Sequence, residues 1–272
     1  ALMRVWIPGS ILGAWALLAM SVYLLPLSPN LIQLEHILVP PGEGALLGYD
    51  DLGRDIGERL LVGARTSFLV SFWVVGLSAL IGTLVGTVSA YQGGLLDRAI
   101  VQVIDIFLAF PGILLAIALA GLLGPGIENV VMALAAVGWV GYARLSRAQV
   151  LSLKHREHVR AAEALGSRRL RIMTRHLLPL MMAPLIVEAT FGVAAVVIAE
   201  AGLSFLGLGV QPPDASWGAM IRDGTRYMLV APHMVLAPGI AIFAVVLSVN
   251  LLGDRLRDTM DKRLATAARK DQ

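Results

Sequence analysis

The chain has 272 residues, of which 57% are hydrophobic and only 15% are charged, and its formal net charge is +3. A soluble domain carries about 25% charged residues, so this composition excludes an ordinary water-soluble protein and indicates one embedded in lipid. The absence of cysteine from the sequence excludes disulfides, thiolate metal sites and a cysteine nucleophile.

Six stretches are apolar over roughly the 20 residues that a helix needs to cross a bilayer. They are residues 5–25, 68–91, 99–120, 130–148, 180–203 and 235–252. No small-residue cleavage site follows the first stretch, so we expect a retained helix there. The third contains Phe110-Pro111-Gly112, which favours a kink. The pattern predicts an all-α integral membrane protein with about six transmembrane helices.

The segment between the first two spans is polar, and we expect an amphipathic helix at residues 56–64 to lie along the membrane surface. In the second span, Gly82-x-x-x-Gly86 permits close helix contact, more often within one chain than between two.

The loop between the fourth and fifth spans is strongly basic, and residues 151–179 predict two short helices around a hinge. In the first helix, residues 151–165, Leu151, Val159 and Leu165 share one face at helical spacing with His155 and Ala162. Gly166 suits the left-handed position that ends a helix, and Ser167 can cap the next one at 168–177. Pro179 either stops that second helix or begins the fifth span. The sequence leaves two interpretations open, a solvated connector and a docking surface for another protein.

Ionisable residues inside spans are costly and often functional, and three occur: Asp105, Glu188 and Glu200. They are candidates for the translocation path or for pairing between subunits, and the alternative is a structural pair or, for Glu200, a cap near the outer surface. After the fifth span, residues 214–227 predict a short outer helix on which Trp217 and Met220 are candidates for docking a binding protein; the alternative is an ordinary interfacial position.

Orientation follows from the basic residues, which gather on the cytoplasmic side. The loop holds Arg147, Lys154, Arg156, Arg160, Arg168, Arg169, Arg171 and Arg175, and the tail after residue 252 holds six more. Both should be cytoplasmic, together with both termini, and residues 26–67, 121–129 and 207–234 should lie outside. Three arginines at 54, 59 and 65 strain this assignment. We divide the chain into an N-terminal helix and periplasmic segment (1–67), a core (68–256) with the loop 149–179, and a cytoplasmic tail (257–272).

The loop resembles the cytoplasmic signature of ABC importer permeases, which reads Glu-Ala-Ala, three residues, Gly, nine residues, Ile, one residue, Leu-Pro. Ala161, Ala162, Gly166, Leu178 and Pro179 match at that spacing, whereas Arg160 replaces Glu and His176 replaces Ile. In that family the loop forms a coupling helix held in a groove of the ATPase. The resemblance therefore implies a set of coupling residues, which are His158, Val159, Arg160, Ala161, Ala162, Glu163, Leu165, Gly166, Leu178 and Pro179.

Further stretches resemble the C-type permeases of dipeptide, oligopeptide and nickel importers. They are LGYDDLGRD at 47–55, GARTS at 63–67, LSFLGLGVQPP at 203–213 with SWG at 216–218, NLLGD at 250–254 and LRD at 256–258. This resemblance implies the type I (MetI-like) ABC transporter membrane domain in a bacterial inner membrane. It also implies four kinds of partner: a second, B-type permease, two ATPase subunits that bind ATP and Mg²⁺, a periplasmic or lipid-anchored solute-binding protein, and membrane lipid.

No catalytic role is expected for the chain itself. A phosphate-binding loop needs Gly-Lys, and none of its lysines follows a glycine, so ATP hydrolysis must come from other subunits. No nucleic acid, bound cofactor or metal is expected, and His155, His158 and His176 are better explained as surface residues. A secondary transporter, a channel and an intramembrane protease are the rival classes. The resemblance favours peptides as the solute, with nickel or another metal chelate as the alternative.

Overall fold

The structure is a computed structural model, and it describes residues 3–22 and 24–270, with side chains described for 7–22 and 24–260. Helices dominate these residues, and the only β pairing among them is an isolated bridge between Tyr49 and Asp55. The helices are α1 (Met3–Ser21), η1 (Leu34–His36), α2 (Ile56–Gln92), α3 (Gly94–Leu108), α4 (Gly112–Leu123), α5 (Ile127–Leu153), α6 (Glu157–Ala164), α7 (Arg169–Ile172), the π-helix η2 (Met173–Leu177), α8 (Leu178–Phe205), α9 (Trp217–Thr225) and α10 (His233–Lys270).

Within the described residues, four helices are long and apolar enough to cross a membrane: α2, α5, α10 and the continuous helix Arg169–Phe205 that contains α8. The expected third span is not one rod, because α3 and α4 meet at a bend of 87°. Pro111 explains the break, because it has no backbone N–H to continue the helical hydrogen bonds of α3. The first expected span corresponds to α1, which has 19 residues.

Helix α2 begins twelve residues before the expected second span, at Ile56 rather than residue 68, so the surface helix at 56–64 is wrong. Asp55 caps this start, because its side chain accepts hydrogen bonds from the backbone N–H groups of Gly57 and Glu58. The first turns of α2 are buried by two tryptophans: the indole N–H of Trp217 donates to the carbonyl of Leu60, and that of Trp15 to the carbonyl of Ala64.

The central contact of the bundle joins α2 to α5, and two glycines make it possible. A side chain at Gly82 would collide with the backbone of Trp139 and Ala143, and one at Gly86 with the backbone of Ala143. The glycine pair therefore serves packing within the chain, as the sequence favoured.

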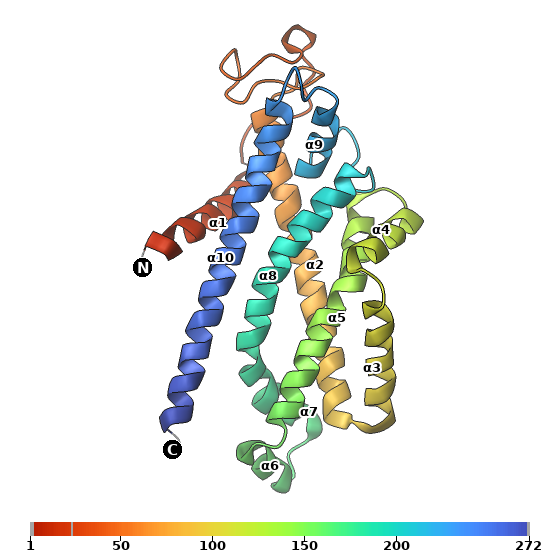
Figure 1. The fold of residues 1–272 in the computed structure, drawn as a ribbon, viewed down its shortest axis with the longest axis vertical. Helices are drawn as coiled ribbons and strands as arrows, with labels where there is room; N and C mark the ends of the chain where they lie inside the picture. Colours follow the sequence, from red (N-terminus) through yellow and green to blue (C-terminus); the bar gives the residue numbers. More distant parts are fainter. Residues whose placement is uncertain (1–2, 23, 271–272) are drawn as a thin grey trace.

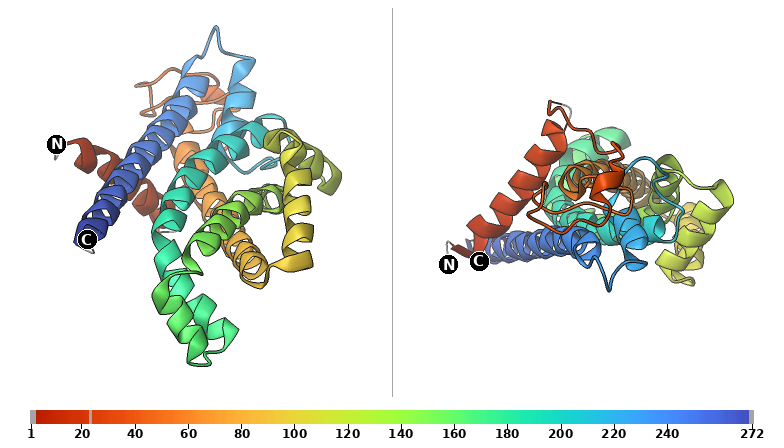
Figure 2. Two further views of the ribbon diagram at one scale, coloured as in Figure 1. Left: turned by 60° about the horizontal axis from the view of Figure 1, so that its bottom comes forward. Right: turned by 90° about the horizontal axis from the view of Figure 1, so that it is seen from above.

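The two ends of the bundle differ (Figure 1). Helix α6 lies at one end, and α9 lies at the other with residues 24–55. The C-terminal end of α10 points toward the α6 end, as the alternating topology requires. Both figures place α1 and α10 on one side of the bundle and the bent pair α3–α4 on the other (Figure 2). The predicted boundaries of the chain's division, at 67–68 and 256–257, fall inside the continuous helices α2 and α10. The division itself stays a prediction.

Two of the three arginines that conflict with the predicted orientation, Arg54 and Arg59, form ion pairs inside the chain. Arg54 Nε lies 2.7 Å from Asp50 Oδ2, and Arg59 Nε lies 3.5 Å from the same atom. The side chains of Asp50, Arg54 and Arg59 are buried, and Arg59 also donates to the carbonyls of Pro29 and Pro213. Burial, together with the Asp50 carboxylate, raises the pKa of the neighbouring Asp51 above its ordinary value. Asp50, Arg54 and Arg59 therefore stabilise the fold at the α9 end. The two arginines do not indicate which side of the membrane this end faces.

Candidate functional site

Helix α6 is an eight-residue helix that ends in a rigid turn. Gly166 adopts φ +78°, its N–H donates to the carbonyl of Glu163, and the N–H of Ser167 donates to the carbonyl of Ala162. These two bonds form a Schellman motif, which favours glycine at this position. The expected hinge glycine is thus confirmed, but Ser167 is not the next cap, because Arg168 occupies the N-cap of α7.

The first predicted helix of the loop, 151–165, is wrong as one element. Helix α5 continues to Leu153, and a turn separates it from α6. Val159 and Ala162 face inward and are buried, whereas His155 is exposed and Leu165 is 86% exposed. The prediction from helical spacing failed because the turn at residues 154–156 changes the direction of the chain between α5 and α6.

The buried face of α6 belongs to a cluster at the α6 end of the bundle. Val159 belongs to one cluster of buried residues with Ile172 of α7, Leu177 of η2, Val150 of α5 and Ala90 near the end of α2. Pro179 lies in the first turn of α8, so of the two expected roles it is the start of the fifth span. Helix α6 therefore packs on α7 and shares one buried cluster with the ends of α2, α5 and the helix Arg169–Phe205.

Two polar contacts, which the sequence did not predict, fasten the same region to the end of α2. The Tyr91 hydroxyl donates to Glu163 Oε1 at 2.8 Å, which joins α2 directly to α6. Asp97 of α3 accepts two hydrogen bonds from Arg147 of α5, each 2.8 Å long, and a third from Ser89. These residues are far apart in the chain, so only co-variation between the two positions in an alignment of homologous sequences could have indicated the pairs.

The outward face of α6 offers the remaining coupling candidates. His158, Arg160, Ala161 and Gly166 are exposed, as is Pro179, and Leu178 is half-buried. Among the described residues, no group of three or more His, Cys, Asp or Glu side chains is placed to hold a metal ion. The face carries small side chains beside Arg160 and the exposed carboxylates Glu157 and Glu163, and it is available to a protein partner.

The three acids in the spans have different environments. Glu200 is fully buried and accepts hydrogen bonds from Ser67 of α2 at 3.0 Å and from Ser204 at 2.8 Å. Its burial and these two hydrogen bonds favour the structural alternative for Glu200, and a role in the path or in subunit pairing stays a prediction. Glu188 and Asp105 are both exposed on the chain and stay candidates.

Trp217 and Met220 lie on α9, so the short helix expected within residues 214–227 is confirmed, and its position outside the membrane stays a prediction. Their side chains are 2% and 6% exposed, however, and pack in the core with Trp15 and Ile56. A binding protein cannot contact them in this conformation, because the apolar face of α9 covers the start of α2. Docking at other residues of the α9 end stays a prediction.

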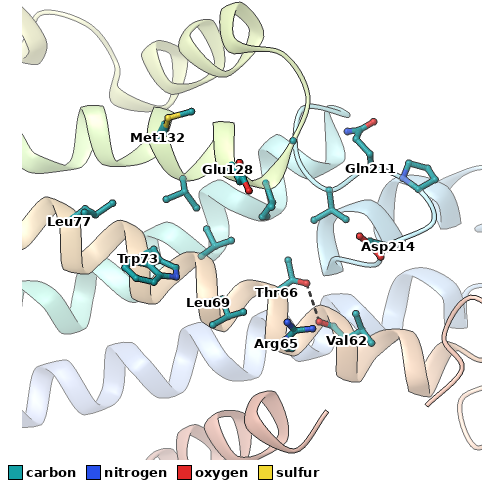
Figure 3. A pocket seen from close by; sticks show the side chains of 16 residues that line it. Val62, Arg65, Thr66, Leu69, Trp73, Leu77, Glu128, Met132, Gln211 and Asp214 are labelled. Atoms are coloured by element: carbon teal, nitrogen blue, oxygen red, sulfur yellow. Dashed lines mark hydrogen bonds between the residues drawn. The ribbon is translucent and has the colours of Figure 1, made fainter. Parts of the chain in front are cut away.

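Two of the cavities among the described residues lie against both α2 and α5. The first, the α9-end cavity, has a volume of about 840 Å³ and lies between α2, the start of α5 and residues 210–214. Figure 3 shows Leu77, Trp73 and Met132 toward one end of it, and Arg65 and Asp214 toward the other.

The second, the intramembrane cavity, has a volume of about 720 Å³ and lies between α2, α4, α5 and α8. Its walls are mostly aliphatic and glycine, and Glu188 is the one ionisable carboxyl among its lining residues.

Comparison with known proteins adds family information to this geometry. Residues 78–266 match the family model described as "Binding-protein-dependent transport system inner membrane component". A glutathione transport system permease protein of Pectobacterium atrosepticum is 39% identical over 93% of this chain and 86% of the relative. A dipeptide transport system permease protein of Alkalihalophilus pseudofirmus is 43% identical over 80% of this chain and 71% of the relative.

A dipeptide permease of Haemophilus influenzae is 39% identical over 90% of this chain and 85% of the relative. Among solved structures, an inward-facing form of the MetNI methionine ABC transporter superposes with a TM-score of 0.59 at 19% identity. The match covers 74% of this chain and 95% of that one, and it shows that the two share a fold.

Proposed function

The chain belongs to the family of binding-protein-dependent transport system inner membrane components, and from this premise we propose how it works and what it carries. As a permease subunit of an ABC importer it is a multi-pass membrane protein, and it acts in transport rather than in catalysis. Our proposal is that it forms half of a path for di- and oligopeptides, driven by ATP that two separate ATPase subunits bind with Mg²⁺ and hydrolyse.

The observation that carries the coupling mechanism is the attachment of α6. Its outward face is free for an ATPase groove, while its inward face, through Val159, joins the buried cluster of α2, α5 and α8. The Schellman turn at Gly166 and the Tyr91–Glu163 hydrogen bond fix α6 to these spans, so that a displacement of α6 would move the spans with it. Closure of the ATPase pair would then move the spans as packed bodies, which is the kind of two-state change that alternating access requires.

The position of Glu188 supports a water-accessible or subunit-covered face on α8. The residue is near the middle of the 37-residue helix Arg169–Phe205 and is exposed on the chain. A carboxyl group facing lipid at that depth costs several kcal/mol, so this face is better placed against the second, B-type permease and the path between them. Asp105 remains a weaker candidate for the same interface.

Peptides are the proposed cargo because the relatives named above are peptide or glutathione permeases by name. Delivery would come from a periplasmic or lipid-anchored solute-binding protein at the α9 end. This assigns the α6 end and both termini to the cytoplasm of a bacterial cell. The metal-chelate alternative has no comparable observation in its favour.

The coupling assignment is tested by Gly166→Val and Ala162→Leu in the assembled transporter. We expect Gly166→Val to lower ATP-driven uptake about ten-fold, because a β-branched residue is strained at positive φ and the turn would reorganise. Ala162→Leu should do the same by forcing α6 away from its cluster. Gly121→Val is the control, because that glycine has open space around it. Undiminished uptake in both loop variants, with normal membrane insertion, would refute the role of α6.

A further inference from the structure

A further cavity, the α1–α10 groove, lies on the side of the bundle away from α3 and α4. It has a volume of about 630 Å³, and α1 contributes Ile7, Pro8 and Ile11 to its wall, while the rest of the wall comes from α10. In Figures 1 and 2, α1 and α10 diverge instead of running parallel, which leaves this space between them. The side chains in it are accessible, because Ile7 is 55% exposed and Phe243 is 66% exposed.

The wall from α10 includes a row of residues, the α10 stripe, that changes from apolar to basic along the helix. Its members follow one another at a spacing of four residues: Phe243, Leu247, Leu251 and Arg255. The twelve positions from Phe243 to Arg255 correspond to about 18 Å along a helix. Half of the hydrocarbon core of a bilayer is about 15 Å thick. The α10 stripe is therefore about as long as one leaflet is deep, with a cation at one end.

The level of the stripe in the membrane matches a leaflet as well. The apolar stretch of α10 covers residues 235–252, so Phe243 lies at its middle and Arg255 lies just beyond its α6-end limit. A guanidinium group at that level is beside the headgroup region, where the phosphates of lipids lie. The apolar part of the stripe is beside the acyl chains of the same leaflet.

Arg255 has no anionic partner in the part of the chain whose side chains are described. It forms no ion pair with any of these residues, and no Asp or Glu lines the groove. Its side chain is half-buried at the end of the apolar wall, whereas Arg257, two residues along α10, is exposed and does not line the groove. The groove thus complements an amphiphile that has an apolar chain and an anionic head.

We propose that the α1–α10 groove binds one anionic phospholipid, with an acyl chain along the α10 stripe and the phosphate at Arg255. Basic pockets between transmembrane helices on the cytoplasmic side bind anionic headgroups. A helix of the second permease is the competing occupant, but it is about 10 Å across and would need roughly twice the volume of the groove over the length of the stripe. The leaflet follows from the proposed orientation, whereas the site depends neither on the cargo nor on the role of α6.

The experiment uses the assembled transporter, with its ATPases, in phosphatidylcholine nanodiscs that contain a small fraction of a photoreactive lipid. Two probes carry the same diazirine in the middle of an acyl chain, and one is a phosphatidylglycerol while the other is a phosphatidylcholine. Mass spectrometry locates the labelled residues. We expect the phosphatidylglycerol probe to label α1 and α10 beside Phe243 about five times as strongly as the phosphatidylcholine probe, because one basic residue favours an anionic headgroup by about that factor.

The variants isolate the charge at the end of the stripe. Arg255→Gln should remove the preference, so that both probes label the groove equally, and Arg255→Lys should keep most of it. Arg257→Gln removes the same charge from the same helix outside the groove, and it should leave the preference unchanged. Ala244→Phe places a ring in the groove and should lower labelling there by both probes.

A second measurement guards against a variant that merely folds badly. Added phosphatidylglycerol should raise the melting temperature of the wild type and of Arg257→Gln more than that of Arg255→Gln, since a ligand stabilises the state that binds it. Equal labelling by the two probes in the wild type, an equal loss of preference in Arg255→Gln and Arg257→Gln, or labelling that Ala244→Phe does not lower would overturn the proposal. A groove that no lipid probe labels would overturn it too, because protein then covers the wall.

Discussion

At the scale of single residues, burial separates side chains that the sequence treats alike. Glu188 and Glu200 lie on the same helix, yet Glu200 joins α2 to α8 through Ser67 and Ser204, whereas Glu188 faces a cavity. An acid with two hydroxyl donors inside the chain is a structural group, and an acid at the surface of a span needs an external partner.

Tyr91 is the residue whose single hydrogen bond most directly affects coupling. Tyr91→Phe removes the contact with Glu163 and leaves the ring in place, so α6 should follow the ATPase while α2 follows less closely. We expect about a two-fold rise in ATP hydrolysed per peptide imported, because the hydrogen bond is exposed and a pair of this kind contributes about 0.4 kcal/mol. Tyr227→Phe, whose hydroxyl makes no hydrogen bond among the described residues, should not change this ratio. An unchanged ratio in Tyr91→Phe would show that the contact is incidental.

Asp97 fastens the α2–α3 turn to α5. Asp97→Asn keeps the shape but loses the charge in a two-pronged pair with Arg147. The pair is partly exposed, so we expect a loss of about 1 kcal/mol in the free energy of unfolding, seen as a lower melting temperature in detergent. Asp258→Asn, at an exposed site of α10, is the matched control, and equal melting temperatures for both variants would contradict the assignment.

At the scale of elements, glycine and proline decide how the helices meet. Pro111 and Gly112 turn the third span through 87°, which puts α4 over the α9-end half of α5 while α3 stays beside the other half. Glycines 82 and 86 allow α2 and α5 to touch backbone to backbone. The bend follows because proline has no backbone N–H, and the close contact follows because glycine has no side chain.

A matched pair of glycines on α2 tests this packing. Gly82→Leu would force the branched side chain into the backbone of α5, and we expect it to destabilise the protein by about 3 kcal/mol. Gly76→Leu makes the same change on the same helix where nothing lies within 4 Å, and should be nearly neutral. Thermal unfolding of both variants in one detergent measures the difference. Similar melting temperatures would mean that α2 and α5 do not pack in this register.

At the scale of the whole molecule, function depends on which end faces the cytoplasm. The α6 end carries the basic loop, and the α9 end carries the buried Asp50–Arg54–Arg59 network. With Arg54 and Arg59 neutralised internally, Arg65, Arg222 and Arg226 remain at the α9 end, and the larger number of basic residues in the loop favours a cytoplasmic α6 end.

Because the sequence contains no cysteine, single cysteines can report this orientation without background. Leu165→Cys lies at the tip of the α6 end, and Leu229→Cys lies at the α9 end, where Leu229 is fully exposed. In intact cells with a permeable outer layer, a membrane-impermeant maleimide should label position 229 at once and position 165 only after the inner membrane is opened. The opposite result would reverse the assigned topology and remove α6 from the reach of the ATPases.

The sequence by itself determined the apolar stretches, the basic loop, the glycine that ends α6 and the family resemblance. These are local properties, since hydrophobicity, charge and the backbone preference of glycine are set by neighbouring residues. Prediction from the sequence failed where contacts with distant segments determine the structure. Helix α2 starts at Ile56 because tryptophans from α1 and α9 bury its first turns.

Only the tertiary structure decided which candidate residues meet. Tyr91 and Glu163 are 72 residues apart in the chain, and Asp97 and Arg147 are 50 apart, so no local pattern predicts either pair. The same holds for the burial of Glu200 and Trp217 and for the cavity around Glu188. Each depends on how several helices pack together, and packing is a property of the assembled bundle rather than of any one segment.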